Sequence, residues 1–119
     1  MAKYFNRDEF TCSYTGENEI KEEFVDRLDL LREACGFPFV IYSGYRAKSH
    51  PVEVNKTTTG THVQGIAADI KVTDGTQRFK IVEEAIKLNF TGIGVANGFV
   101  HVDIRSGDDT TPYVMWVYK

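Results

Sequence analysis

The stretch from Gly92 to Ile104 reads Gly-Ile-Gly-Val-Ala-Asn-Gly-Phe-Val-His-Val-Asp-Ile, and it decides the fold class. The Asn97-Gly98 dipeptide lies between two β-rich runs and is a strong hairpin signal, because both residues tolerate positive φ. Residues 92–96 and 99–104 are therefore predicted to form paired antiparallel strands. Side chains alternate across a strand, so the second strand has an apolar face and a polar one. The apolar face carries Val100, Val102 and Ile104, and the polar face carries Phe99, His101, Asp103 and Arg105.

Outside the hairpin, two helices are predicted from apolar residues that recur every three or four positions. The first runs from about residue 20 to Cys35, with Asn18 as its N-cap and Gly36 as its stop signal. The second begins at Asp74. Its apolar stripe is expected to consist of Phe79, Val82 and Ile86, with Ala85 and Leu88 beside it.

Three further strands are predicted at residues 39–42, 67–72 and 113–118, which are short runs of β-branched and aromatic residues or alternate in polarity. In the middle one, Ala68, Ile70 and Val72 are expected to point inward. The order helix, strand, loop, strand, helix, hairpin, strand predicts an α+β domain. Its sheet is expected to be mainly antiparallel, with the helices packed on it.

The composition is that of one ordinary globular domain. The chain has 119 residues, of which 42% are hydrophobic and 26% charged, so a core is possible without disulfides or metals. The net charge of -3 lacks the basic excess of a nucleic-acid-binding protein. No apolar run approaches the roughly 20 residues that span a bilayer, so no membrane insertion is expected. We expect a single domain over residues 1–119 and a monomer.

The N-terminus and the two cysteines bear on the cellular compartment. Residues 1–9 lack the apolar segment of a secretory signal, so we expect synthesis in a cytoplasm. Cys12 and Cys35 form no CxxC motif, which argues against a structural zinc knuckle. In a cytoplasm they are expected to be reduced and half-buried thiols, with one disulfide as the alternative.

A second group of polar residues precedes and enters the strand at 67–72. His62 lies in the loop before this strand, and Asp69 lies on the face opposite Ala68 and Ile70. If this strand pairs with 99–104, then His62, Asp69 and His101 converge. Two imidazoles and a carboxylate suit zinc, and three protein ligands leave one position open, as in catalytic sites. Spacing alone leaves open the alternative of ordinary polar side chains without a metal.

Three blocks of the sequence resemble a known family. The segment Gly-Thr-His-Val-Gln-Gly-Ile-Ala-Ala-Asp at 60–69 resembles the SxHxxGxAxD motif of the zinc D-Ala-D-Ala carboxypeptidase family. That family includes bacteriophage endolysin peptidases, and its fold is shared with the hedgehog signalling domain. Ser-Gly-Tyr-Arg at 43–46 resembles the family's SGYR segment, and residues 99–105 resemble the block that carries its last zinc ligand. The blocks occur in the family's order, and the resemblance covers about residues 5–118.

The resemblance implies roles for individual residues. One Zn²⁺ ion would be held by His62, Asp69 and His101. Arg46 would bind a carboxylate or carbonyl of the substrate and stabilise the oxyanion, because a guanidinium is always charged and donates in a planar fork. An arginine paired with a glutamate is the alternative. The other substrate-binding candidates are Ser43, Tyr45 and His50, and for His50 a solvated loop position is the alternative.

The sequence departs from the family at two positions. Gly60 replaces the serine of the motif, so either the hydroxyl of Thr59 or Thr61 substitutes for it or one hydrogen bond is missing. Gly98 stands where many members carry a catalytic carboxylate, three residues before the last histidine. Asp103, on the same strand face as His101, is therefore the predicted general base. Its alternative role is that of an anchoring partner for Arg105 or Arg46.

In function, the resemblance implies a zinc metallopeptidase that hydrolyses peptide bonds in peptidoglycan stem peptides. It would act as a D,D-carboxypeptidase or an endopeptidase, for instance as a phage endolysin. Such an enzyme would be made in the cytoplasm of a bacterial or phage-infected cell and act on the cell wall after release. The alternative is a catalytically inactive zinc-binding recognition module of the same fold, which the hedgehog relative illustrates and Gly98 supports.

Overall fold

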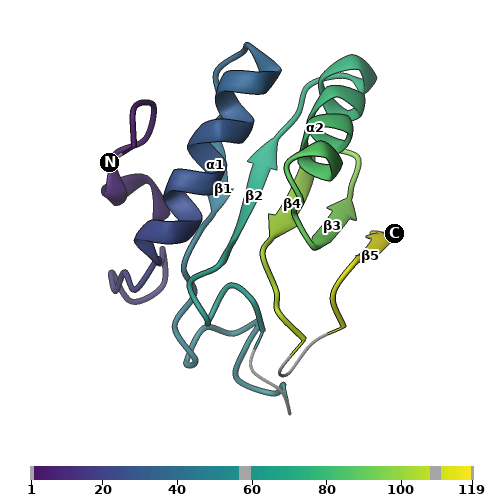
Figure 1. Ribbon diagram of the computed structural model, residues 1–119. Coiled ribbons are helices and arrows are strands. Elements are labelled where there is room, and N and C mark those ends of the chain that lie inside the picture. Colours follow the sequence, from purple (N-terminus) through teal and green to yellow (C-terminus); the bar gives the residue numbers. More distant parts are fainter. Residues whose placement is uncertain (1, 57–59, 108–110, 119) are drawn as a thin grey trace.

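The computed structural model describes residues 2–56, 60–107 and 111–118, and in these residues two α-helices pack on a five-stranded sheet (Figure 1). A short 3-10 helix, η1, precedes them. The helices are η1 (Arg7–Phe10), α1 (Glu22–Cys35) and α2 (Gly75–Lys87). The strands are β1 (Ile41–Ser43), β2 (Ala67–Lys71), β3 (Gly92–Val95), β4 (Phe99–Asp103) and β5 (Val114–Val117). The predicted α+β class is confirmed.

The sheet has the strand order β1-β2-β4-β3-β5. The first three neighbouring pairs are antiparallel, and only β3 and β5 run parallel. The sheet is therefore mainly antiparallel, as predicted, with β5 at one edge. The two strands that carry the polar sequence blocks, β2 and β4, pair directly, with Asp69 opposite His101.

The predicted hairpin forms between β3 and β4, and Gly94 lies opposite His101. The backbone of the turn differs from the expectation, because neither Asn97 nor Gly98 has a positive φ. Bonds from outside the hairpin hold this turn. The Val72 amide donates to the carbonyl of Gly98 at 3.0 Å, and the Arg78 side chain donates to the carbonyls of Ala96 and Asn97.

The start of α1 differs from the prediction. The helix begins at Glu22 with Lys21 as N-cap, which makes no side-chain cap bond. The Asn18 side chain instead accepts a hydrogen bond from the Ile20 amide at 3.1 Å, so the predicted Asn18 cap is wrong. Gly36 ends the helix as predicted, with a left-handed φ of 78° that suits glycine.

For α2, the Asp74 cap is confirmed, since its carboxylate accepts from the Gln77 amide at 2.8 Å. The predicted apolar stripe is correct only in part, because Val82, Ala85 and Leu88 contact the core as expected but its other two residues do not. Phe79 and Ile86 are 70% and 58% exposed, whereas Ile81 and Ala85 are fully buried. The helix carries apolar residues around more than one face, and packing on the sheet and on α1 selects the face with Ile81 and Ala85.

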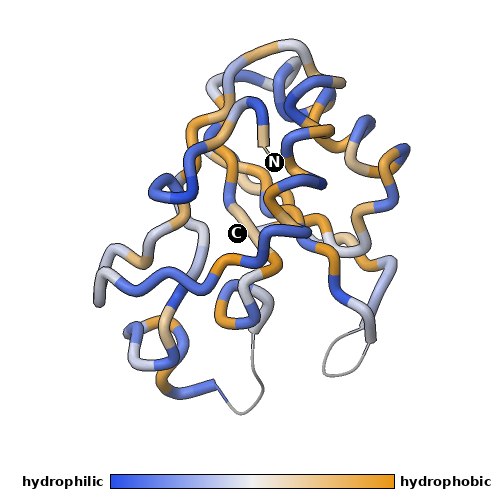
Figure 2. Tube along the Cα trace, turned by 60° about the vertical axis from the view of Figure 1, so that its left-hand side comes forward, coloured by the Kyte–Doolittle hydropathy of each residue, from blue (hydrophilic) through white to orange (hydrophobic). Residues whose placement is uncertain are grey.

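One face of β2 and β4 forms the core with the helices. Its strand residues are Ala68, Ile70, Val100 and Val102, and its helix residues include Phe24, Leu28, Leu31 and Ile81. Figure 2 shows that the loops at the lower end of the molecule are mostly hydrophilic. Cys12 and Cys35 are free thiols, as predicted, but both are buried rather than half-buried. None of the described helices is long and apolar enough to cross a membrane.

Candidate metal centre

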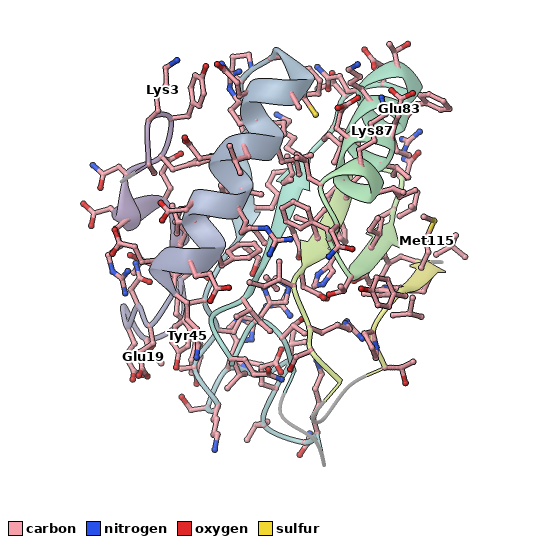
Figure 3. All side chains as sticks on the ribbon, in the orientation of Figure 1. Lys3, Glu19, Tyr45, Glu83, Lys87 and Met115 are labelled. Atoms are coloured by element: carbon pink, nitrogen blue, oxygen red, sulfur yellow. The ribbon has the colours of Figure 1, made fainter. Side chains whose placement is uncertain are left out.

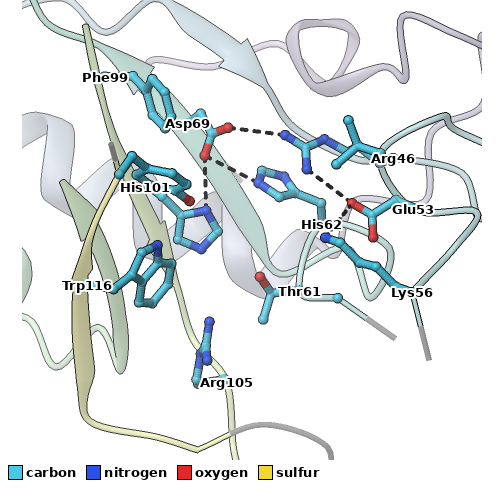
Figure 4. A pocket seen from close by; sticks show the side chains of 13 residues that line it. Arg46, Glu53, Lys56, Thr61, His62, Asp69, Phe99, His101, Arg105 and Trp116 are labelled. Carbon is cyan, nitrogen blue, oxygen red and sulfur yellow. Dashed lines mark hydrogen bonds and ion pairs between the residues drawn. The ribbon is translucent and has the colours of Figure 1, made fainter. Parts of the chain in front are cut away.

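The face of β2 and β4 that points away from the helices gathers the predicted metal ligands. Asp69 and His101 are register partners across the two strands, and His62 reaches them from the turn before β2 (Figure 4). All three side chains are buried. Each offers one ligand atom, and these atoms lie within 4.8 Å of one another. The structure therefore brings the three residues together as the sequence analysis expected.

Both imidazoles face the same carboxylate oxygen. Nε2 of His62 lies 3.3 Å from Oδ1 of Asp69, and Nδ1 of His101 lies 3.0 Å from it. The two rings are 5.0 Å apart between centroids and inclined at 72°. Two ring nitrogens and one carboxylate oxygen that converge in this way form a donor set that fits Zn²⁺.

The second nitrogen of each imidazole has an acceptor that fixes the proton on it. Nδ1 of His62 lies 2.7 Å from the carbonyl of Gly44, which only accepts, so Nδ1 carries the proton and Nε2 keeps its lone pair. Nε2 of His101 lies 2.8 Å from Oδ2 of Asp103. When His101 is neutral, Asp103 retains the proton on Nε2 and leaves Nδ1 to act as a ligand. Metal-binding histidines are commonly oriented by such partners.

The charges of the group also suit a cation. Burial lowers the pKa of His62 and favours its neutral form. Burial opposes ionisation of Asp69, but the facing imidazoles of His101 and His62 outweigh it and hold the pKa of this carboxyl well below its usual range. Burial likewise lowers the pKa of His101, yet its bonds to Asp103 and Asp69 raise the pKa overall. A bound cation would therefore compete with a proton at His101.

Asp103, the predicted general base, is fully buried and engaged by two residues. Oδ1 accepts from Nε of Arg105 at 2.9 Å and from the Arg105 amide at 3.1 Å. Oδ2 accepts from His101 and, at 2.7 Å, from the second guanidinium nitrogen of Arg105. The described lining of the cavity beside the metal group does not include Asp103. This geometry favours the anchoring role with Arg105, and the general-base role stays a prediction.

Arg46 lies beside the metal group and bridges three side chains. Its Nε donates to Oγ of Ser43 at 3.1 Å, and one terminal nitrogen donates to Oδ2 of Asp69 at 3.4 Å. The other terminal nitrogen donates to Oε2 of Glu53 at 3.1 Å. The sequence analysis did not single out Glu53. The one available signal was that Glu53 is the single acidic residue of the loop at 47–61.

Two predicted substrate-binding residues lie away from the metal group. Tyr45 is buried, and its hydroxyl donates to Oε2 of Glu19 at 3.0 Å (Figure 3). Burial and this neighbouring carboxylate raise the pKa of Tyr45 to about 12. His50 packs edge-on against the ring of Tyr14, and its Nδ1 accepts from the Val52 amide. Tyr45 and His50 line a second cavity of about 230 Å³, which also includes Ser43 and Arg46.

The cavity beside the metal group has a volume of about 320 Å³ and two unlike walls (Figure 4). The charged wall consists of Arg46, Glu53 and Lys56, and the aromatic wall consists of Phe99, Trp116 and Tyr118. Thr61 also lines the cavity, whereas Thr59 lies outside the described residues. The rings of Trp116 and His101 are 5.0 Å apart. Sequence reasoning did not anticipate the aromatic wall, because Trp116 and Tyr118 reach the site only through the pairing of β5 with β3.

Comparison with known protein families gives a match over most of the chain. A family model described as Peptidase M15 matches residues 3–103, which is most of the chain. The matched region contains Arg46 and all three residues of the metal group. Three further residues of the cavity lining, Arg105, Trp116 and Tyr118, lie beyond it. A search of curated proteins found no match.

Proposed function

The chain belongs to the peptidase M15 family, and we propose that it is a zinc metallopeptidase that hydrolyses peptide bonds in peptidoglycan stem peptides. One observation carries the proposal: both histidines turn an available ring nitrogen toward Oδ1 of Asp69, while Gly44 and Asp103 hold their other nitrogens. Such orientation by outer partners is typical of metal ligands.

Zinc with three protein ligands supplies Lewis-acid catalysis and lowers the pKa of water at the open position. In the proposed reaction, His62, Asp69 and His101 would hold the ion, and Asp103 would keep His101 in the required tautomer. Arg46 lines the cavity next to Asp69 and adds a permanent positive charge that favours a developing oxyanion. The aromatic wall offers an apolar surface to the peptide.

The peptidoglycan substrate rests on the likeness of three sequence blocks to the zinc D-Ala-D-Ala carboxypeptidases. We infer a D,D-carboxypeptidase or endopeptidase that is made in the cytoplasm and acts on the wall after release, with a phage endolysin as one form. A single functional domain and a monomer belong to the same proposal.

The test is digestion of purified peptidoglycan and soluble muropeptides by the zinc-loaded protein. Mass spectrometry follows released D-alanine and newly formed amino groups. We expect cleavage that requires zinc and falls to background in His101→Ala. Stoichiometric zinc binding without cleavage across several wall chemotypes would overturn the proposed activity.

A second candidate is an inactive zinc-binding module that recognises a wall component. Two observations favour it: Gly98 leaves no carboxylate three residues before His101, and both oxygens of Asp103 are engaged. The same digestion separates the candidates, since this module would co-sediment with peptidoglycan in a zinc-dependent way without producing new amino groups. Cleavage gained by Gly98→Asp, with none in the parent chain, would also support the second candidate.

A further inference from the structure

Glu53 is a buried carboxylate that the proposed reaction does not use. Its side chain is 2% exposed, and it lies at the end of the charged wall, on the far side of Arg46 from Asp69 (Figure 4). Its Oε2 accepts hydrogen bonds from both cationic side chains of this wall, from Arg46 at 3.1 Å and from Nζ of Lys56 at 3.2 Å.

The second oxygen of Glu53 has no hydrogen-bond partner among the described residues. It lies against Gly60, where an added Cβ would stand 3.0 Å from it. Burial of a carboxylate with an unpaired oxygen is costly, because protein bonds do not fully replace the water bonds. Ion pairs with Arg46 and Lys56 offset part of this cost on the other oxygen, and this arrangement points to a role that acts through its partners.

The partner that reaches the metal group is Arg46. A guanidinium is planar and rigid, so fixing two of its nitrogens fixes the direction of the third. Ser43 holds Nε and Glu53 holds one terminal nitrogen, and the remaining nitrogen consequently points at Oδ2 of Asp69. With Oδ2 held, Oδ1 of Asp69 faces the two imidazoles.

We propose that Glu53 is a positioning residue of the metal centre, which holds the Arg46 guanidinium against Oδ2 of Asp69 and so presents Oδ1 to the metal. Without Glu53, the Arg46 guanidinium loses one of the bonds that fix its direction, so this geometry predicts weaker metal binding. This inference rests on the zinc site of the proposed function but not on peptidase activity.

The test is a double-mutant cycle read out as zinc affinity, measured by competition with a chromophoric chelator. We expect Glu53→Gln and Arg46→Met each to weaken zinc binding by about tenfold or more, in the range found for outer partners of metal ligands. In the Arg46→Met background, Glu53→Gln is expected to change the affinity by less than about twofold, because its effect passes through Arg46.

Glu84→Gln is the matched control. Glu84 also pairs one oxygen with two lysines, Lys80 and Lys87, but it lies on α2. Removal of the Glu84 charge is expected to leave zinc affinity unchanged. Glu53→Asp, which keeps the charge but shortens the side chain, is expected to weaken zinc binding and covers the case in which Glu53→Gln fails to fold. Circular dichroism of each variant without zinc verifies the fold.

Unchanged zinc affinity in folded Glu53→Gln, or an equal loss in both backgrounds, would overturn the inference. A wild-type chain that binds no zinc would overturn it together with the proposed function. If the cycle gives the expected coupling while no peptide is cleaved, Glu53 keeps its positioning role and only the proposed activity fails.

Discussion

Along β2 and β4, neighbouring residues face opposite sides of the sheet, and the two sides differ in kind. Toward the helices lie Ala68, Ile70, Val100 and Val102, all fully buried. On the side of the metal group lie Asp69, His101 and Asp103, which are nearly as buried. Burial of the first set is itself stabilising, because it removes apolar surface from water. Burial of the second set is unfavourable unless each polar atom finds a partner.

The same contrast continues on β3. Toward the helices it presents Ile93 and Val95, and toward the cavity it presents Gly92 and Gly94. An added Cβ would stand 2.2 Å from Oδ1 of Asp103 at Gly92, and 2.6 Å from the Trp116 ring at Gly94. Apolar side chains on one side of the sheet thus stabilise the fold, whereas glycines on the other side leave space for a polar network and an aromatic wall.

The largest effect is expected when a methyl group is added to a glycine of β3 on the polar side of the sheet. Gly92→Ala forces Asp103 to move, and His101 and Arg105 lose their shared partner. We expect zinc affinity to fall by about 100-fold or more, at the upper end for outer partners of metal ligands, and activity to fall with it. Chelator competition and the muropeptide assay provide the measurement.

The control for this variant is Gly98→Ala in the same hairpin. An added Cβ at Gly98 meets no described atom within 4 Å, and its φ is not positive. Zinc affinity and activity should match those of the parent chain. If both variants lost zinc affinity equally, any substitution in the hairpin would disturb the metal centre, and the space above Gly92 would have no special role.

Asp103→Asn tests the polar side with almost no change of shape. An amide does not match the charge of Arg105 or reliably hold the proton of His101, so zinc affinity is expected to fall by about 10- to 100-fold. Turnover measured at saturating zinc then separates the two roles of Asp103. Near-normal turnover would remove it as general base and leave the anchoring role, whereas loss of turnover with zinc bound would support the base.

Ile70→Ala tests the apolar side of the sheet, which packs against the helices. It removes buried methyl groups next to Asp69 in sequence but on the opposite face, and it should lower the free energy of unfolding by about 2–5 kcal/mol. Urea denaturation gives this value. Zinc affinity of the folded variant is expected to stay within about twofold of the parent, and a large loss would mean that the two faces are coupled.

The smallest expected effect concerns acid stability. The pKa values of Asp69 and Asp103 lie below the usual value of about 3.9, so the unfolded chain binds protons at these groups before the folded chain does. Their contribution is present above about pH 4 and is lost as the pH falls below it. Urea denaturation without zinc should therefore show a slope in acid that Asp103→Asn reduces and Ile70→Ala leaves unchanged.

Features of this molecule that arise from residues close in sequence can be predicted from local patterns, whereas features that arise from residues far apart in sequence cannot. Strand alternation and the Asn97-Gly98 signal are local patterns with fixed geometry, and they place His101 and Asp103 on one face. The pairing of β2 with β4, which brings Asp69 to them, is a long-range contact that entered the prediction only as a condition. The ligand set in turn rests on a motif that keeps His62 and Asp69 at a constant spacing.

Other features depend on tertiary contacts that no local pattern encodes. The exposure of Phe79 follows from how α2 sits on the sheet, and the inward turn of Tyr45 follows from its contact with Glu19. The engagement of Asp103 depends on free space over Gly92 in a neighbouring strand. Glu53 meets Arg46 only because the loop between them folds back on itself.

The most direct test of the central claim, a zinc centre on the polar side of β2 and β4, is zinc K-edge X-ray absorption spectroscopy of the loaded protein. We expect one zinc ion per chain with two imidazole nitrogens and oxygen ligands at about 2.0–2.2 Å and no sulfur. His62→Ala and His101→Ala should each remove one imidazole from the spectrum or abolish binding. Sulfur scattering at about 2.3 Å, or a spectrum unchanged by both substitutions, would contradict it.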